Sequence, residues 1–145
     1  MSIRLLERGD YDRWLPLWQD NCSQLIADDV TAETWRRITH LKENVFALGI
    51  FGKDQNLMGF LHYILHPVTG FREPACYMQD LYVAETYRRQ GLAKRLVWEL
   101  HDIGKNESWA RIYWFAERQN EAVQNLYKNL GINMDFSLHM LLTKD

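Results

Sequence analysis

The sequence contains little cysteine, almost no net charge and no long uninterrupted apolar run. Its 145 residues include two cysteines, Cys22 and Cys76, and carry a formal net charge of -2. The cysteines lack metal-ligand spacing and fall in different expected elements, which favours free thiols in a reducing compartment. Charges interrupt every apolar stretch before membrane-spanning length, so we expect a cytoplasmic protein without a membrane segment. The absence of a broad basic field argues against nucleic acid as the main partner.

Apolar side chains, by contrast, are abundant and evenly distributed. Hydrophobic residues make up 47% of the chain and aromatic residues 13%. This amount of apolar surface can offset the entropy lost on folding, and the length suits one core. There is no repeat, linker or low-complexity tract. We therefore expect one folded domain over residues 1–145.

The pattern of apolar residues and turn formers predicts an α/β fold with a mixed sheet. Expected strands cover residues 3–6, 45–51, 57–66, 76–83 and 111–116, and residues 132–143 are expected to form a last strand or a bent pair. Expected helices begin after Asp10 with Pro16 near the first turn, at Thr31 towards Leu41, at Gly91, and at Asn120 until Gly131 stops the last one. Residues 23–30 are expected to form a loop, and residues 52–56 a hairpin connection. The strand–helix–strand order over residues 76–116 predicts a parallel crossover.

A strand end, a short loop and a helix start follow one another between Asp80 and Ala93. Backbone N–H groups at such a helix start point outward at the positive end of the helix dipole and can hold a pyrophosphate. Gly91 lets a ligand approach the backbone closely, and Ala93 adds little bulk. Basic residues at this position oppose the helix dipole, which favours an anion over a merely solvated basic helix start.

This segment, Arg88-Arg89-Gln90-Gly91-Leu92-Ala93, resembles the Arg/Gln-x-x-Gly-x-Gly/Ala signature of the GCN5-related N-acetyltransferases. Leu81-Tyr82-Val83 resembles the family's splayed strand, and Asn120, Ala122 and Tyr127 before Gly131 resemble its second motif. Within the family, similarity to a yeast histone and small-amine acetyltransferase group lies in three segments: Trp14-Leu15-Pro16-Leu17-Trp18, Asp80-Leu81-Tyr82-Val83 and Tyr113-Trp114. Gln79 departs from similar polyamine acetyltransferases, which carry Glu there, and this weakens the case for a polyamine.

The resemblance implies a single-domain fold of this family, with a mixed central sheet, splayed strands and flanking helices. It also implies an enzyme that transfers the acetyl group of acetyl-CoA to a primary amine of a small molecule or protein by direct attack, without a metal. The residues implied to bind the cofactor are Leu81, Tyr82, Val83, Arg88, Arg89, Gln90, Gly91, Leu92, Ala93, Lys94, Asn120 and Tyr127. Tyr127 matches the general acid for the leaving thiolate. Many similar enzymes pair through terminal strands, which implies a homodimer.

The general base and the acceptor site have weaker signals. Asp80 and Glu85 flank the implied splayed strand, and either could take the amine proton. Asp28 and Asp29 could attract a cationic amine, although an ordinary solvated loop pair is an equal interpretation.

Several residues have simpler structural interpretations. Tyr127 fits a core aromatic position by periodicity alone. His62 and His66 share an expected strand face, but they lack further ligands for a metal and are better interpreted as packed or cleft-lining. Trp14, Trp18 and Trp35 have core spacing. The alternative function is a catalytically silent acyl-CoA-binding module, which would not need Tyr127 as an acid.

Overall fold

A computed structural model describes residues 1–40 and 42–144 and divides the chain into two compact units, Met1–Trp114 and Phe115–Asp145. In the first unit the elements follow the order β1 (Ser2–Leu5), α1 (Tyr11–Asn21), α2 (Asp28–His40), β2 (Val45–Phe51), β3 (Leu57–His66), β4 (Ala75–Val83), α3 (Leu92–Glu107) and β5 (Ile112–Tyr113). Short 3-10 turns lie at Arg8–Asp10, Lys53–Gln55 and Glu85–Tyr87. The second unit contains α4 (Glu121–Tyr127).

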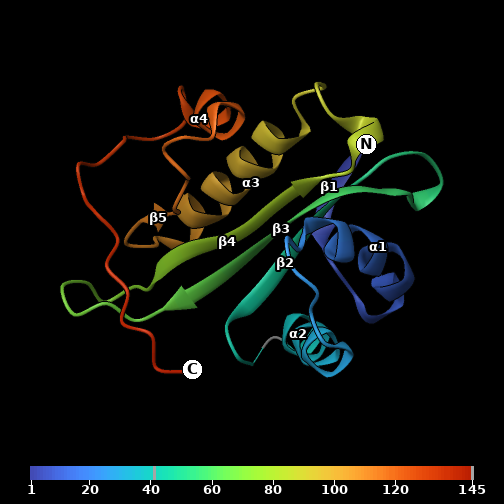
Figure 1. Ribbon diagram of the computed structural model, residues 1–145, viewed down its shortest axis with the longest axis horizontal. Helices are drawn as coiled ribbons and strands as arrows, with labels where there is room; N and C mark the ends of the chain where they lie inside the picture. The colour runs from blue at the N-terminus through green and yellow to red at the C-terminus, as the bar shows by residue number, and fades with distance from the viewer. Residues whose placement is uncertain (41, 145) are drawn as a thin grey trace. The chain divides into compact units, whose positions relative to one another are not determined.

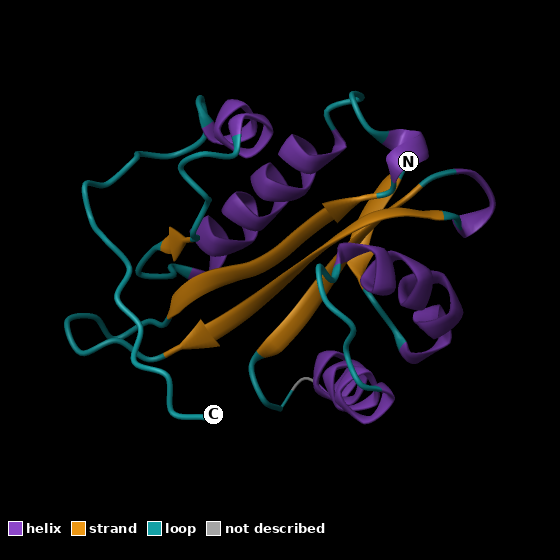
Figure 2. Cartoon of the chain, in the orientation of Figure 1, coloured by secondary structure: helices purple, strands orange, loops and turns teal. Residues whose placement is uncertain are grey.

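The first unit is built on a mixed sheet in the order β1-β2-β3-β4-β5 (Figure 1). Neighbouring strands are antiparallel from β1 to β4, whereas β4 and β5 are parallel, with Cys76 opposite Ile112. The hairpin of β2 and β3 and the parallel crossover through α3 confirm two sequence predictions. Figure 2 shows the strands of this sheet between α3 on one face and α1 and α2 on the other.

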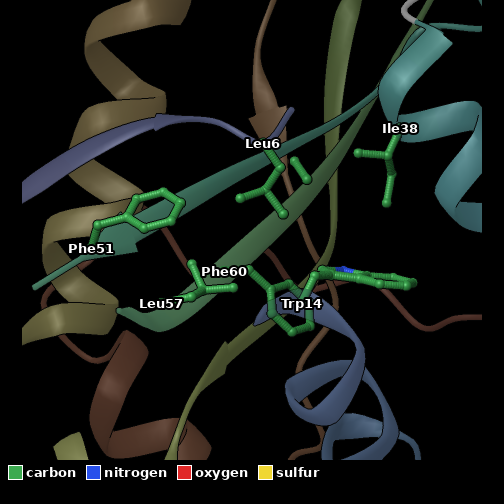
Figure 3. Packing of buried hydrophobic residues seen from close by; sticks show 7 residues of the cluster. Leu6, Trp14, Ile38, Phe51, Leu57 and Phe60 are labelled. Atoms are coloured by element: carbon green, nitrogen blue, oxygen red, sulfur yellow. The ribbon is translucent and has the colours of Figure 1, made fainter. Parts of the chain in front are cut away.

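The face that carries α1 and α2 has an aromatic core. Trp14 of α1 and Phe60 of β3 are both fully buried, and they pack with Leu6, Ile38, Ala47, Phe51 and Leu57 (Figure 3). Trp14 also stacks on Trp18 at 5.5 Å between ring centroids. These contacts confirm the core interpretation of Trp14 and fix α1 on the sheet, because large aromatic rings contribute much of the apolar area buried in a core.

The N-terminal helices begin differently from the prediction. Pro16 lies inside α1, in its second turn and not its first. It is exposed there, so water can reach the backbone carbonyl that its missing N–H leaves unpaired. The predicted loop over residues 23–30 is too long, because α2 begins at Asp28 and not at Thr31. Carboxylates in a first turn favour an early start, since they face the positive end of the helix dipole. Leu41 lies outside the described residues.

The C-terminal predictions also need correction. The strand expected over residues 111–116 is only two residues long, because a bulge bends β4 soon after Tyr77 and ends the pairing. Asn120 does cap α4, accepting a hydrogen bond from Val123 N–H at 3.1 Å, but the helix ends at Tyr127, before Gly131. The described residues of 132–143 form no strand, and a strand requires a hydrogen-bonded partner. Their large apolar side chains are exposed instead.

Candidate functional site

A β-bulge in β4 determines which side chains face α1. His62 lies opposite Asp80, whereas the adjacent Tyr63 lies opposite Met78, so Gln79 is left without a counterpart on β3. Successive residues of a strand point to opposite faces of the sheet, so Met78 and Asp80 would share one face in a regular strand. The extra residue at the bulge places their side chains on different faces. The bulge thus places Asp80 on the sheet face that α1 covers.

Asp80 lies at the end of a hydrogen-bonded chain that begins in the aromatic core. Trp14 Nε1–H donates to His62 Nε2 at 3.1 Å, and His62 Nδ1 lies 3.0 Å from Asp80 Oδ2. Asn21 Nδ2, at the end of α1, lies 3.4 Å from Asp80 Oδ1. The His62 side chain is 4% exposed and that of Asp80 is 22% exposed, so the carboxylate is the more accessible of the two.

Two further titratable groups lie close to this carboxylate. Burial raises the pKa of the Cys22 thiol, and the negative charge of Asp80 raises it further. The pKa of Tyr77 is also raised, first by burial and then by Tyr113 and Asp80. Both groups are therefore neutral at physiological pH, and Asp80 is the anion among them.

The β5-facing edge of β4 is open next to this carboxylate. β5 pairs with β4 only at Cys76 and Tyr77, and no other described strand continues along that edge as far as Val83. On the opposite side β3 approaches β4 closely, because a Cβ at Gly59 would lie 2.7 Å from the Tyr82 carbonyl. Residues 81–83 therefore combine a fixed inner edge with an outer edge that can accept an extended ligand.

The start of α3 has the geometry of an anion site. Gly91 is the N-cap, with φ of 76°, and a Cβ built there would meet nothing within 4 Å. The first turn of α3 contains no acidic residue, and no side chain caps it. The first backbone N–H that bonds within the helix is that of Arg95, to the Gly91 carbonyl at 3.1 Å. The N–H groups before it, at residues 92–94, point out of the helix start.

The basic residues before α3 differ in their environment. Arg88 Nε donates to the Val83 carbonyl at 2.9 Å, and its guanidinium lies 5.3 Å from the centre of the Tyr82 ring. Arg88 therefore ties the loop to the end of β4. Arg89 has φ of 65°, a left-handed conformation that is unusual for a residue with a side chain. Glu85 is exposed in the 3-10 turn between β4 and this loop.

In the second unit, Asn120 and Tyr127 lie at opposite ends of α4. The Asn120 carbonyl oxygen is used by the helix cap, which leaves its amide nitrogen to reach a ligand. Burial raises the pKa of Tyr127, so its hydroxyl is protonated throughout the physiological range. Protonation is the state that a general acid needs.

Asp28, Asp29 and His66, the remaining candidate residues, form no hydrogen bond with the Asp80 carboxylate that the structure describes. Asp28 and Asp29 are exposed in the first turn of α2, and Trp18 Nε1–H ties that turn to α1 by donating to Thr31 Oγ1 at 3.1 Å. His66 Nε2 lies 2.7 Å from the Tyr113 hydroxyl, while His62 bonds to Trp14 and Asp80. The two histidines thus serve different partners, and the described part of the chain holds no cluster of metal-ligating side chains.

Sequence reasoning missed the link between His62 and Asp80. The two residues are 18 positions apart, and only the strand register brings them together. A buried histidine beside a carboxylate has no local sequence signal.

No described helix has the length and hydropathy that a bilayer crossing requires.

Comparisons with known proteins identify similar sequences and folds. The model of the acetyltransferase (GNAT) family matches residues 7–132. The chain is 24% identical over 141 residues to the D-amino-acid N-acetyltransferase HPA3 of Saccharomyces cerevisiae, covering 94% of this chain and 88% of that protein.

Solved structures show the same fold. A ribosomal-protein-alanine N-acetyltransferase from Brucella melitensis biovar Abortus 2308 is 28% identical with a TM-score of 0.79, over 98% of this chain and 99% of that chain. The structure of AAC(6')-Iy in complex with a bisubstrate analogue, CoA-S-monomethyl-acetylneamine, is 17% identical with a TM-score of 0.83, over 99% of this chain and 98% of that chain.

Proposed function

Because the chain belongs to the acetyltransferase (GNAT) family and is an acetyl-CoA-dependent N-acetyltransferase, we propose that the start of α3 binds the coenzyme A pyrophosphate. The observation that carries this proposal is the left-handed Gly91 cap with open space above it, followed by outward N–H groups at residues 92–94. Such a cradle binds phosphate oxygens through the backbone and the helix dipole. Arg88, Arg89, Gln90 and Lys94 add side-chain donors around it.

The pantetheine arm then lies along the open edge of β4 at residues 81–83. An extended chain that carries amide groups can pair with an unpaired strand edge as an added strand would. This path leads the thioester towards the bulge at Gln79 and the Asp80 carboxylate. An N–H of this edge can polarise the thioester carbonyl. Asn120 contributes a further amide contact to the same arm.

Asp80 is the general base in the proposed mechanism. A cationic amine must lose a proton before its nitrogen can attack the thioester carbon, and Asp80 is the partly exposed anion beside the open edge of β4. Glu85 is the second candidate, but it is exposed and lies beyond the end of the strand. Tyr127 donates a proton to the leaving thiolate of coenzyme A.

The acceptor is a primary amine of a small molecule or of a protein. Of the relatives named above, one is a D-amino-acid N-acetyltransferase and another a ribosomal-protein-alanine N-acetyltransferase, and the acceptors in these names share an amine. Asp28 and Asp29 supply negative charge at the start of α2 that would attract a cationic acceptor. An amine of this kind, and not a neutral nucleophile, suits a carboxylate base.

We also propose that residues 1–145 form one domain and that two copies of it pair as a homodimer in the cytoplasm. The support for self-association is the row of exposed apolar side chains that alternate with polar ones near the C-terminus: Ile132, Met134, Phe136, Leu138 and Met140. Alternation of this kind suits a strand with one buried face. A second copy of the chain could cover it.

A thioester-consumption assay tests the proposed function. Purified protein is given acetyl-CoA and a panel of amines: D-amino acids, peptides with N-terminal alanine, aminoglycosides and polyamines. We expect release of coenzyme A with one class, and a fall of about 100-fold or more in kcat for Asp80→Asn with unchanged acetyl-CoA affinity. Glu85→Gln is the matched control and should retain activity. If no amine releases coenzyme A although acetyl-CoA binds, the chain is a silent acyl-CoA-binding module.

A further inference from the structure

His62 is buried behind the proposed general base, and both of its ring nitrogens are engaged. It is 3% exposed and comes from the centre of β3, where Trp14 contacts one side of the ring and Asp80 the other. The inference drawn from this arrangement rests on the proposed role of Asp80 as the base. It concerns how the carboxylate is oriented and which of its oxygens accepts the proton.

Trp14 determines the protonation state of the imidazole. An indole N–H can only donate, so His62 Nε2, at 3.1 Å from Trp14 Nε1, must be the acceptor and carries no proton. The proton of the neutral ring is therefore on Nδ1, which faces Asp80 Oδ2 at 3.0 Å. A doubly protonated ring would bring two N–H groups together in the core. The His62–Asp80 contact is thus a hydrogen bond from a neutral imidazole to a carboxylate.

The order of the two groups is reversed relative to a catalytic dyad in which a carboxylate orients a histidine base. In that dyad the imidazole faces the substrate and the carboxylate is buried behind it. Here the imidazole side chain is 4% exposed and the carboxylate side chain 22% exposed. His62 therefore cannot reach an amine, and it acts on the reaction only through Asp80.

We propose that His62 is a positioning residue that directs the amine proton to Oδ1 of Asp80. Oδ2 already accepts the His62 Nδ1–H, whereas the contact of Oδ1 with Asn21 is long, at 3.4 Å. When the cationic amine binds, its N–H bond breaks and the proton moves to Oδ1. The amine and Asp80 both become neutral, and the amine keeps the electron pair that attacks the thioester. His62 stays neutral, and its hydrogen bond to Oδ2 persists.

The other groups around Asp80 are compatible with this assignment. Cys22 and Asn21 lie at the end of α1, and Tyr77 precedes the bulge on β4; none of them is charged at physiological pH. His62 is therefore the group that distinguishes the two carboxylate oxygens. Its removal should alter both the orientation and the proton affinity of the base.

The tautomer is tested directly on the wild-type protein. Two-bond ¹H–¹⁵N correlation spectra of histidine-labelled protein distinguish the Nδ1–H form, the Nε2–H form and imidazolium, and the spectrum of His62→Asn assigns the signal. We expect the Nδ1–H form of His62 in the wild type at neutral pH, because Trp14 Nε1–H donates to the other ring nitrogen. Trp14→Phe removes that donor and should let other protonation forms of the ring appear in the spectrum, while Trp35→Phe, which alters the same aromatic cluster, should leave the spectrum unchanged. An Nε2–H or imidazolium signal in the wild type at neutral pH overturns the proposal.

The kinetic test compares His62→Phe with His62→Asn in the complete chain. Phe removes the donor to Oδ2, so we expect kcat to fall about tenfold and the acidic limb of the pH–rate profile to move up by about one pH unit, with the acetyl-CoA KM unchanged. Asn, whose amide nitrogen can occupy the place of Nδ1, should restore most of the profile.

Asp80→Asn distinguishes a wrong assignment of the base from a wrong assignment of the positioning residue. If Asp80→Asn is inactive but His62→Phe keeps the wild-type rate and profile, the base assignment stands and the positioning role is wrong. If Asp80→Asn retains full activity, the proposed base itself is wrong, whatever the spectra show. Should His62→Phe fail to fold, the wild-type spectrum and His62→Asn still decide.

Discussion

At the scale of single residues, Tyr127 offers a test of proton delivery to the leaving thiolate. Burial raises the pKa of its hydroxyl, so the group can donate a proton across the whole physiological range. We expect Tyr127→Phe to lower kcat by roughly 100-fold while leaving acetyl-CoA affinity nearly unchanged, because only the proton is removed. The activity of the wild type should persist to a pH above the ordinary pKa of tyrosine and then decline.

The measurement is steady-state kinetics across pH, with cofactor binding followed by calorimetry. Tyr113→Phe, in β5, is the matched control for loss of a tyrosine hydroxyl. Wild-type turnover of Tyr127→Phe, under conditions where chemistry limits the rate, would show that Tyr127 only packs.

Asp10 is the residue whose charge most clearly supports the fold. Its side chain is 3% exposed and accepts hydrogen bonds from Arg4 at 2.7 Å and from Glu7 N–H at 2.7 Å, which join β1 to the start of α1. The hydrogen bond from Arg4 is the main cause of its lowered pKa. We expect Asp10→Asn to lower the free energy of unfolding by about 2 kcal/mol at pH 7, since hydrogen bonds to charged groups are involved.

The sign of the pH dependence follows from that lowered pKa. The stabilisation is complete above the pKa of an unfolded aspartate and disappears as the pH falls through the lower pKa of the folded state. Urea unfolding of wild type and Asp10→Asn should therefore converge at strongly acidic pH. An Asp12→Asn control, on the exposed side of α1, should change little. Equal stabilities of wild type and Asp10→Asn at pH 7 would contradict the prediction.

At the scale of elements, the start of α3 can be tested through its cap. Gly91→Glu places bulk and negative charge above the outward N–H groups, so coenzyme A affinity should fall below detection, by about 100-fold or more. Because φ at Gly91 is 76°, any side chain there also strains the backbone. Gly91→Ala carries the strain without the charge and is the control. Calorimetry with coenzyme A should show a much smaller loss for Ala, and similar affinities for Glu and wild type would remove the phosphate assignment.

The start of α2 tests the acceptor side. Asp28→Asn with Asp29→Asn removes two exposed charges, each worth on the order of 1 kcal/mol to a nearby cation at low salt. The KM for a cationic amine should therefore rise, more at low ionic strength, while kcat and the acetyl-CoA KM stay constant. Asp20→Asn, on α1, is a control for net charge. An unchanged amine KM at low salt would show that Asp28 and Asp29 only stabilise the helix start.

Elements could be predicted from the sequence where the interactions that form them act within a few residues. The strand ranges of β2 and β3 and the Asn120 cap follow from alternation and turn chemistry, which act within a few residues. The length of β5 depends on a bulge in another strand, and the contact of His62 with Asp80 depends on register. The motif at residues 88–93 is confined to one loop and could be recognised from the sequence. The sequence offered Asp80 and Glu85 equally as the base, and only the register of the sheet places Asp80 beside His62.

At the scale of the whole molecule, the fold assigns different tasks to different parts of one chain. The proposed base, Asp80, lies on the sheet beside an aromatic core, and the proposed phosphate cradle lies in the loop before α3. The proposed pantetheine contact Asn120 and the proposed general acid Tyr127 belong to the second unit.

The exposed apolar residues of the C-terminal segment predict self-association of the chain. Phe136 and Leu138 are 74% and 63% exposed, and together with Met134 they lie in an alternating row that the described chain does not pair. Exposed apolar side chains in such a row are costly in water, and a second copy could bury them. We expect sedimentation velocity to show a wild-type dimer and Phe136→Asp with Leu138→Asp to be monomeric. Circular dichroism and coenzyme A affinity should stay unchanged, because the pyrophosphate loop lies in the first unit. Ser137→Asp is the control for added charge on the polar side of the row. A wild-type monomer at all concentrations would reject the dimer, and loss of coenzyme A binding in the double variant would show that the segment supports the fold of each chain and not its pairing.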